Sequence, residues 1–245
     1  MLSFIKPHLE LYTPASPQLT SIHNIGGVTP TVTGTANAVA MATTNQFTRT
    51  TRLQFESAAG ANSNAGIRSS AQTFTMGVPG PPAYGGFRYT GIFGISDAAA
   101  VANASMFVGV RASTAAPGGG FDPSTLTDLI GMGHKAGDTT MSIYYGGSAA
   151  QTPVSLGANF PCNTRNTDMY MLELVNLSSS NNTVYYRVTR LNTGDVATGT
   201  LTGTAGTALP ANTTFLNAAH AFRTNGSTAL AVRIDIAGIA LQAGI

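Results

Sequence analysis

The chain has 245 residues, and its 8 tyrosines and 11 phenylalanines are spread along it, which predicts a folded protein of one large β-domain or two small ones. Only 9% of the residues are charged and the formal net charge is +2, with the basic residues scattered, so the dense basic face of a nucleic-acid-binding protein is excluded. No stretch approaches the roughly 20 apolar residues of a membrane span.

Residues 1–26 differ from the rest of the chain. They contain Pro7, Pro14 and Pro17 and show little alternation of apolar and polar residues. Proline lacks the backbone donor that sheet pairing needs. We therefore expect an N-terminal arm or anchor segment over 1–26 that docks on a partner chain, followed by a β-sandwich domain over 27–245. The alternative is a first strand with a lead-in to the sandwich.

From Val28 onward the dominant period is two, which is typical of half-buried strands. An Ala-rich stretch, residues 97–104, is the one candidate for a short helical turn, with Asp97 as its N-cap. Two Gly/Pro-rich segments, 78–86 and 117–123, are predicted loops. The early strands are expected at 32–41, 47–56, 87–95, 106–111 and 126–132.

The later strands have clearer patterns. Val184, Tyr186 and Val188 share one face of a predicted strand, and the turn residues 192–195 lead into a returning strand over 196–202. Further strands are expected at 140–145, 152–156, 169–176 and 231–239. About a dozen strands separated by turn clusters predict an all-β protein, a two-sheet antiparallel jelly-roll or concanavalin-A-like sandwich.

The sequence predicts no catalytic residue, no metal site and no cofactor. Its ten acidic residues are not spaced as a pair on one strand, there is no Gly-x-Ser-x-Gly elbow, and the four histidines have no zinc-binding spacing. The single cysteine, Cys162, is read as a structural thiol. The acids Glu173 and Asp235 are expected to form cross-strand pairs with an arginine such as Arg187 or Arg233.

Binding without catalysis needs less, and four residues in predicted loops are the candidates. Tyr84 and Phe121 are aromatic residues within the two Gly/Pro-rich loops, and His134 and Asp138 stand in the Gly-rich stretch 131–138. An ordinary turn also explains that stretch, because Gly and Asp are default turn formers.

Three series of strand and turn residues resemble appendage proteins (tail fibre or decoration proteins) of tailed bacteriophages. They run from Phe87 to Ile95, from Met106 to Arg111, and from Ile130 to Asp138, and a similar pattern continues in 156–161, 170–174, 186–194 and 209–216. The resemblance covers about residues 28–245 and has no catalytic signature. It implies a concanavalin-A-like sandwich in a virion assembled in the host bacterial cytoplasm.

The sequence therefore favours a non-enzymatic virion structural protein. The resemblance implies self-association, often as a trimer, and an N-terminal segment that contacts other virion proteins. A host surface glycan or protein is the expected external partner, with no role for nucleic acid or membrane. A free carbohydrate-binding lectin is the alternative, and a glycan depolymerase is a third hypothesis that the sparse acids argue against.

Overall fold

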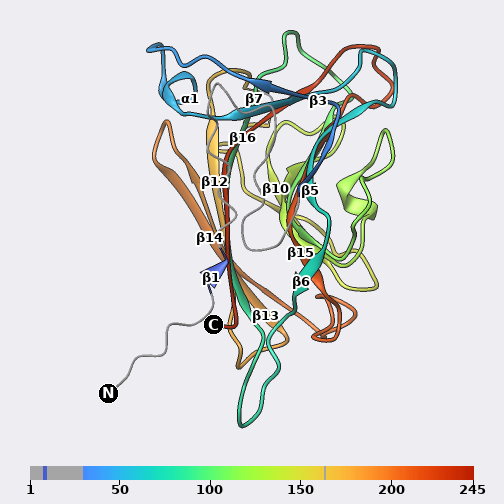
Figure 1. The fold of residues 1–245 in the computed structure, drawn as a ribbon, viewed down its shortest axis with the longest axis vertical. Coiled ribbons are helices and arrows are strands. Elements are labelled where there is room, and N and C mark those ends of the chain that lie inside the picture. Colours follow the sequence, from blue (N-terminus) through green and yellow to red (C-terminus); the bar gives the residue numbers. More distant parts are fainter. Residues whose placement is uncertain (1–7, 10–29, 163) are drawn as a thin grey trace.

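A computed structural model describes residues 8–9, 30–162 and 164–245. In this part of the chain, two antiparallel sheets of eight strands each face one another with the core between them (Figure 1). The prediction of an all-β, two-sheet antiparallel sandwich is confirmed. The predicted arm over 1–26 lies outside the described residues, except for the two-residue strand β1 (His8–Leu9), whose backbone pairs with Gln242 and Leu241.

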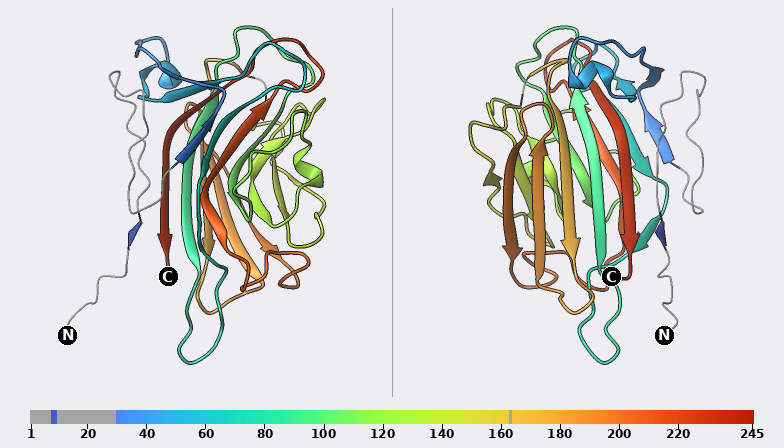
Figure 2. Two further views of the ribbon diagram at one scale, coloured as in Figure 1. Left: turned by 45° about the vertical axis from the view of Figure 1, so that its right-hand side comes forward. Right: turned by 90° about the vertical axis from the view of Figure 1, so that its left-hand side faces the viewer.

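The first sheet is the flatter of the two in Figure 2 and contains the C-terminal strand. Its strands in spatial order are β14 (Asp195–Thr202), β13 (Thr183–Arg190), β12 (Met169–Asn176), β7 (Phe87–Ile95), β16 (Arg233–Ala243), β4 (Leu53–Glu56) and β3 (Thr35–Ala38), and β1 pairs with β16. The predicted strands over 87–95 and 169–176 match β7 and β12. Register is continuous across β7, β12, β13 and β14.

The second sheet is built from short strands around a long central one. Its spatial order is β11 (Val154–Ser155), β10 (Ser142–Gly146), β9 (Leu129–His134), β8 (Ser105–Arg111), β15 (Leu216–Thr224), β5 (Asn64–Ser69) and β2 (Pro30–Thr33), and β6 (Gln72–Phe74) also pairs with β15. Strand β15 is buried along its whole length because both faces of the sheet are covered.

The main core lies between the sheets. Leu172 and Leu174 of the first sheet and Ile143 and Val108 of the second contribute fully buried side chains to it. Removing such apolar surface from water is the main driving force for the fold. In the first sheet the alternating residues of β13 and β14 face outward and are mostly exposed or half-buried, as the period of two predicts.

The outer face of the second sheet has a small core of its own. A loop over residues 112–122, here named the crossing loop, passes over β15 and leads into the short 3-10 helix η1 (Pro123–Thr125). It covers a second apolar cluster made of Phe107, Phe121, Leu129, Tyr144 and Phe222.

Four side chains of the sheet attach the crossing loop through its backbone. Asn217 Nδ2 donates to the Ser113 carbonyl, Arg68 Nε to that of Thr114 at 2.7 Å and Asn64 Nδ2 to that of Pro117 at 2.7 Å, and Thr224 Oγ1 accepts from the Gly120 amide at 2.9 Å.

Several predicted elements were wrong or missed. Residues 46–49 form the short helix α1 (Gln46–Arg49), capped by Asn45, and not the start of a strand. Residues 97–104 contain turns and no helix. Strands β5, β6 and β15 were not predicted, because β5 and β15 contain small residues without clear alternation and β6 has only three residues.

The arginine partners also differ from the prediction in part. Glu173 Oε1 lies 3.2 Å from Arg88 and its Oε2 lies 3.9 Å from Arg187, as a cross-strand pair should. Asp235, however, is fully buried and pairs with Arg52 at 3.0 Å. Arg233 pairs with Glu56 at 2.8 Å.

Candidate functional site

Loops from five parts of the chain meet at one end of the second sheet, where β5 and β8 begin and β9 and β15 end. They surround an open groove of about 330 Å³, here named the loop groove. The groove is lined by amide, hydroxyl and carboxylate groups with one aromatic edge, from Asn62, Asn103, Ser105, Gly120, Phe121, Asp122, Ala136, Gly226 and Ser227.

The side chain of Asn225 connects the loop before β5 to the loop after β15. It is fully buried, its Nδ2 donates to the carbonyls of Gly60 and Leu230 at 2.8 Å each, and its Oδ1 accepts from the Ser63 amide at 2.9 Å. Both N–H groups and the oxygen of this side-chain amide therefore bond to the loop backbone. Asn225 thereby fixes the positions from which Asn62 and Ser227 project.

Glycine at 226 permits the close approach of two groove walls. A Cβ atom there would lie 2.4 Å from the Asn103 carbonyl oxygen, and the residue has a φ of +55°. The backbone N–H of Asn62 donates to the Gly226 carbonyl oxygen at 2.5 Å. Asn62 itself has a φ of +59°, a conformation that asparagine tolerates better than most residues.

The groove presents polar groups that retain capacity for a ligand. Asp122 Oδ1 accepts from the Ser124 amide at 2.8 Å and from its hydroxyl at 2.7 Å, so it caps η1. Asp122 Oδ2 has no hydrogen-bond partner among the described residues. Asn103 Nδ2 donates to Ser227 Oγ at 2.9 Å, which leaves the Asn103 amide oxygen available.

Two of the predicted binding residues lie close to this groove. Phe121 lines it, but only 7% of the residue is exposed because its ring packs in the cluster beneath the crossing loop. Asp138 Oδ2 accepts from the Lys135 amide at 3.0 Å and from the hydroxyl of Tyr144 at 3.2 Å. Tyr144 belongs to the same apolar cluster as Phe121, so it connects the two loops.

His134 points into the interior. It is 1% exposed, and its Nε2 lies 2.8 Å from Nη1 of Arg223, which itself pairs with the buried Asp97. Burial, and then the charge of Arg223, lowers the pKa of His134 to about 3, so a neutral imidazole accepts the hydrogen bond from Arg223.

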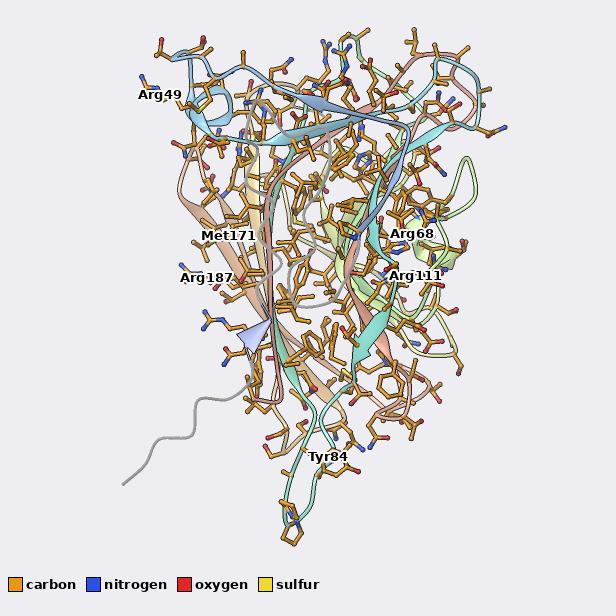
Figure 3. The ribbon with its side chains drawn as sticks, viewed as in Figure 1. Arg49, Arg68, Tyr84, Arg111, Met171 and Arg187 are labelled. Atoms are coloured by element: carbon orange, nitrogen blue, oxygen red, sulfur yellow. The ribbon has the colours of Figure 1, made fainter. Side chains whose placement is uncertain are left out.

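Tyr84 is separate from the other three. It lies on the hairpin that projects from the opposite end of the sandwich (Figure 3), pairs through its backbone with Val78, and is 62% exposed. Of the four predicted residues, Phe121 lines the groove and Asp138 lies two positions after Ala136, which also lines it. His134 lies in the interior, and Tyr84 lies at the far end of the sandwich. The binding role of all four stays a prediction.

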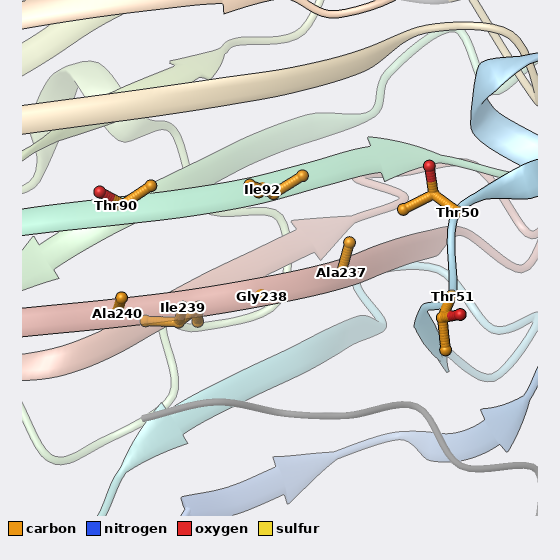
Figure 4. Close-up of a pocket in the computed structure, with 8 residues that line it drawn as sticks. All are labelled: Thr50, Thr51, Thr90, Ile92, Ala237, Gly238, Ile239 and Ala240. Carbon is orange, nitrogen blue, oxygen red and sulfur yellow. The ribbon is translucent and has the colours of Figure 1, made fainter. Parts of the chain in front are cut away.

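A second groove lies on the outer face of the first sheet (Figure 4). It has a volume of about 450 Å³ and is lined by Thr50, Thr51, Thr90, Ile92, Ala237, Gly238, Ile239 and Ala240. None of the described residues that line it has a charged or amide side chain, so these residues offer fewer groups for polar recognition than those of the loop groove.

The main polar residues of the loop groove were not singled out by sequence reasoning. Asn103 stands in an ordinary polar segment, and Asp122 follows Phe121 in a loop that was predicted. Asn62 and Ser227 carry no local signal, because their proximity depends on strand pairing across the second sheet.

The described residues hold neither a cluster of metal ligands nor a membrane-spanning helix. Within the described ranges, no group of three or more His, Cys, Asp or Glu side chains is placed to hold a metal ion. Among the same residues, no helix is long and apolar enough to cross a membrane. Among the residues that the structure describes, five carboxylates form ion pairs with arginines: Glu56, Asp97, Asp168, Glu173 and Asp235.

Several solved structures with a similar fold are plant lectins. Lectin II from Ulex europaeus has a TM-score of 0.57 and 11% identity, and covers 94% of this chain and 100% of its own. The Lotus tetragonolobus seed lectin has a TM-score of 0.51 and 13% identity over 91% and 96% of the two chains. The winged bean acidic lectin, solved with methyl-α-D-galactose, has 0.52 and 12% over 88% and 92%.

These likenesses establish the concanavalin-A-like sandwich that the sequence predicted, and at 11–13% identity they establish the fold alone. No family model and no curated protein matches the sequence. Nothing in these comparisons indicates a bacteriophage origin, so that part of the sequence resemblance stays a prediction.

Proposed function

We propose that this chain is a non-catalytic carbohydrate-binding module that holds a glycan in the loop groove. The observation that carries the proposal is the composition of the groove wall. Asn62, Asn103, Asp122 and Ser227 offer amide, carboxylate and hydroxyl groups at the mouth of a cavity of about 330 Å³. Sugar hydroxyl groups both donate and accept hydrogen bonds, and such a mixed set of partners suits them.

The fold supports the same proposal. The neighbours with this sandwich are lectins, and one of them is solved with methyl-α-D-galactose. A non-enzymatic role is consistent with these neighbours, and five carboxylates of the chain are already committed to arginines. An acid held in a buried ion pair is poorly placed to act as a general acid or base.

Glycan-array binding of the full chain tests the proposal, followed by calorimetric titration with the best ligand. Asn62→Gly removes a groove amide and tolerates the positive φ at that position, and Asp122→Asn keeps the cap of η1 while removing a charge. We expect Asp122→Asn to bind about tenfold more weakly or worse, because a hydrogen bond to a charged group is worth about 1.5 to 3 kcal/mol, and Asn62→Gly to bind about two- to tenfold more weakly, because a neutral one is worth about 0.5 to 1.5 kcal/mol.

Asn166→Gly is the matched control, because Asn166 also has a positive φ, of 58°, and does not line the groove. It should bind as the unaltered chain does. Equal affinities for all the proteins would place the glycan elsewhere on the molecule, and no binding to any glycan would overturn the proposed function.

The virion location predicted from the sequence remains a proposal that is compatible with glycan binding. A module of this kind on a particle would contact a glycan of the host surface. Mass spectrometry of particles purified from cells that carry the gene tests it. Finding the chain only in the particle-free fraction would favour a free lectin.

A further inference from the structure

The lateral edges of the two sheets differ in how well they are protected against pairing with another chain. Strand β11 has two residues and follows Pro153, β2 has four and begins at Pro30, and β3 has four. Strand β14 has eight residues, with no proline, no lysine and no register shift against β13. Short strands, prolines and charges are the usual protection of a sheet edge. Among the described edges, β14 is the one that is long and free of proline, and its single charged residue, Asp195, stands at its first position.

The backbone of β14 has unused hydrogen-bonding groups along that edge. The Gly203 amide donates to the Asn182 carbonyl at 3.1 Å, which fixes the alternation in the β13–β14 ladder. Odd-numbered residues therefore direct their N–H and C=O groups to β13, and even-numbered residues direct theirs away from the sheet. The outward set is Val196, Thr198, Thr200 and Thr202.

We propose that a second copy of this chain pairs with β14 in an antiparallel manner about a twofold axis at Gly199. In this register Thr198 lies opposite Thr200 of the second copy on the outer face. On the inner face Ala197 lies opposite Leu201 of the second copy. Thr–Thr and apolar pairs are favourable cross-strand neighbours.

The neighbouring register, with its twofold axis at Thr198, is less suitable for this strand pairing. A shift that centres the axis on Thr198 would place Asp195 opposite Leu201 of the second copy, a carboxylate beside a buried apolar side chain. In the proposed register Asp195 lies opposite Gly203, at the far end from its own symmetry mate. The two strands therefore meet without a like-charge contact.

The inner side of the axis is already covered. A Cβ atom on Gly199 would lie 2.4 Å from the hydroxyl oxygen of Tyr186, so this tyrosine ring lies directly over the glycine. Two such rings would flank the twofold axis and close the layer beneath the joined strands. Because each copy uses its β14 edge, the pairing is closed and stops at a dimer. The inference thus differs from the trimer expected from the sequence.

Light scattering of the full chain over a wide range of protein concentration tests the proposal. We expect the mass to rise to twice that of the monomer and no further. The variant Thr198→Lys with Thr200→Lys places lysines opposite lysines across the axis and should weaken dimerisation at least tenfold. The matching Thr198→Glu with Thr200→Glu variant should do the same alone, and an equimolar mixture of the two should recover the dimer.

The control is Thr35→Lys with Ala38→Lys, which adds the same charge to exposed positions on β3, the opposite edge of the same sheet. It should dimerise as the unaltered chain does. Circular dichroism checks that each variant is folded. A monomer at all concentrations, a trimer, or a dimer that survives the lysine variant would each overturn the proposal.

Discussion

Arg223 and Asp97 form a buried ion pair that joins the two sheets. Arg223 lies on β15 of the second sheet and Asp97 follows β7 of the first, and each side chain is 1% exposed. Arg223 Nε lies 3.1 Å from Asp97 Oδ2, and Asp97 Oδ1 also accepts from the Arg233 amide at 2.6 Å. Removing one partner leaves a buried charge without compensation.

Asp97→Ala should therefore lower the free energy of unfolding by about 3 to 5 kcal/mol, measured by urea denaturation. The double variant Asp97→Ala with Arg223→Met should recover much of that loss, because no unpaired charge remains buried. Glu173→Gln disrupts a pair whose arginines are more than half exposed, and should cost less than about 1 kcal/mol. Equal effects in both places would contradict the assigned role of burial.

Acid should destabilise the fold through its two buried histidines. Burial, with nearby arginine charges, lowers the pKa values of His134 and His220 from 6.5 to about 3. Between these values the unfolded chain binds more protons than the folded one, so the free energy of unfolding falls as the pH falls from 6.5. Asp235 acts in the opposite direction between pH 3.8 and 6, because burial raises its pKa to about 6 and its proton stabilises the fold there.

Between pH 6 and 4 the unfolded chain binds about one proton more than the folded chain at these three groups, because the two histidines outweigh Asp235. The free energy of unfolding therefore falls by about 1.4 kcal/mol for each pH unit of acidification. His220→Leu removes one of the two buried histidines. It should reduce the slope of the unfolding free energy against pH by about 1.4 kcal/mol per pH unit. Both ring nitrogens of His220 are buried with no hydrogen-bond partner in the described part of the chain, so the change should not destabilise the protein at pH 7. Parallel slopes for the two proteins would rule out a buried neutral His220.

Tyr89→Phe should leave the protein as stable or raise its free energy of unfolding by up to about 1 kcal/mol. The Tyr89 ring is fully buried in the main core, and its hydroxyl has no hydrogen-bond partner among residues 8–9, 30–162 and 164–245. Tyr170→Phe is the control, because the hydroxyl of Tyr170 donates to the Pro161 carbonyl. That change should lower stability by about 1 kcal/mol in the same thermal or urea assay. A loss at Tyr89 equal to that at Tyr170 would show a partner that the structure lacks.

Gly34 lies where the chain passes from β2 in the second sheet to β3 in the first. It has a φ of +80°, and a Cβ atom there would lie 2.3 Å from the Glu56 carbonyl oxygen. Gly157 has almost the same φ, +81°, with nothing near it. Gly157→Ala should cost about 1 to 2 kcal/mol from the backbone alone, and Gly34→Ala should cost clearly more. Equal losses in urea denaturation would mean that the chain relaxes away from Glu56.

Period-two alternation predicted the strands that have one face in the core and one in water, and β12 and β13 are the clearest cases. It failed at β15, because the crossing loop covers the outer face and removes the polar half of the pattern. The arginine partner of His134 stands 89 residues away in sequence, and no local pattern indicates such a pair.

The groove was predictable only in outline for the same reason. The loop over 117–123 was expected, and its residue Asp122 is part of the groove wall. The other walls come from segments that strand pairing brings to the same end of the second sheet. Asn62 and Asn103 are 41 positions apart, and both belong to ordinary polar loops when only the sequence is considered.

The four attachments of the crossing loop all end on its backbone, and each side chain that makes one belongs to the sheet: Asn64, Arg68, Asn217 and Thr224. The loop's own side chains carry none of these attachments. A loop carbonyl is present whatever the side chain, so substitutions of the side chains at 113, 114 and 117 should leave those hydrogen bonds in place. The path of the loop is thus set by side chains of the sheet, whereas the groove wall receives side chains of the loop itself, such as Phe121.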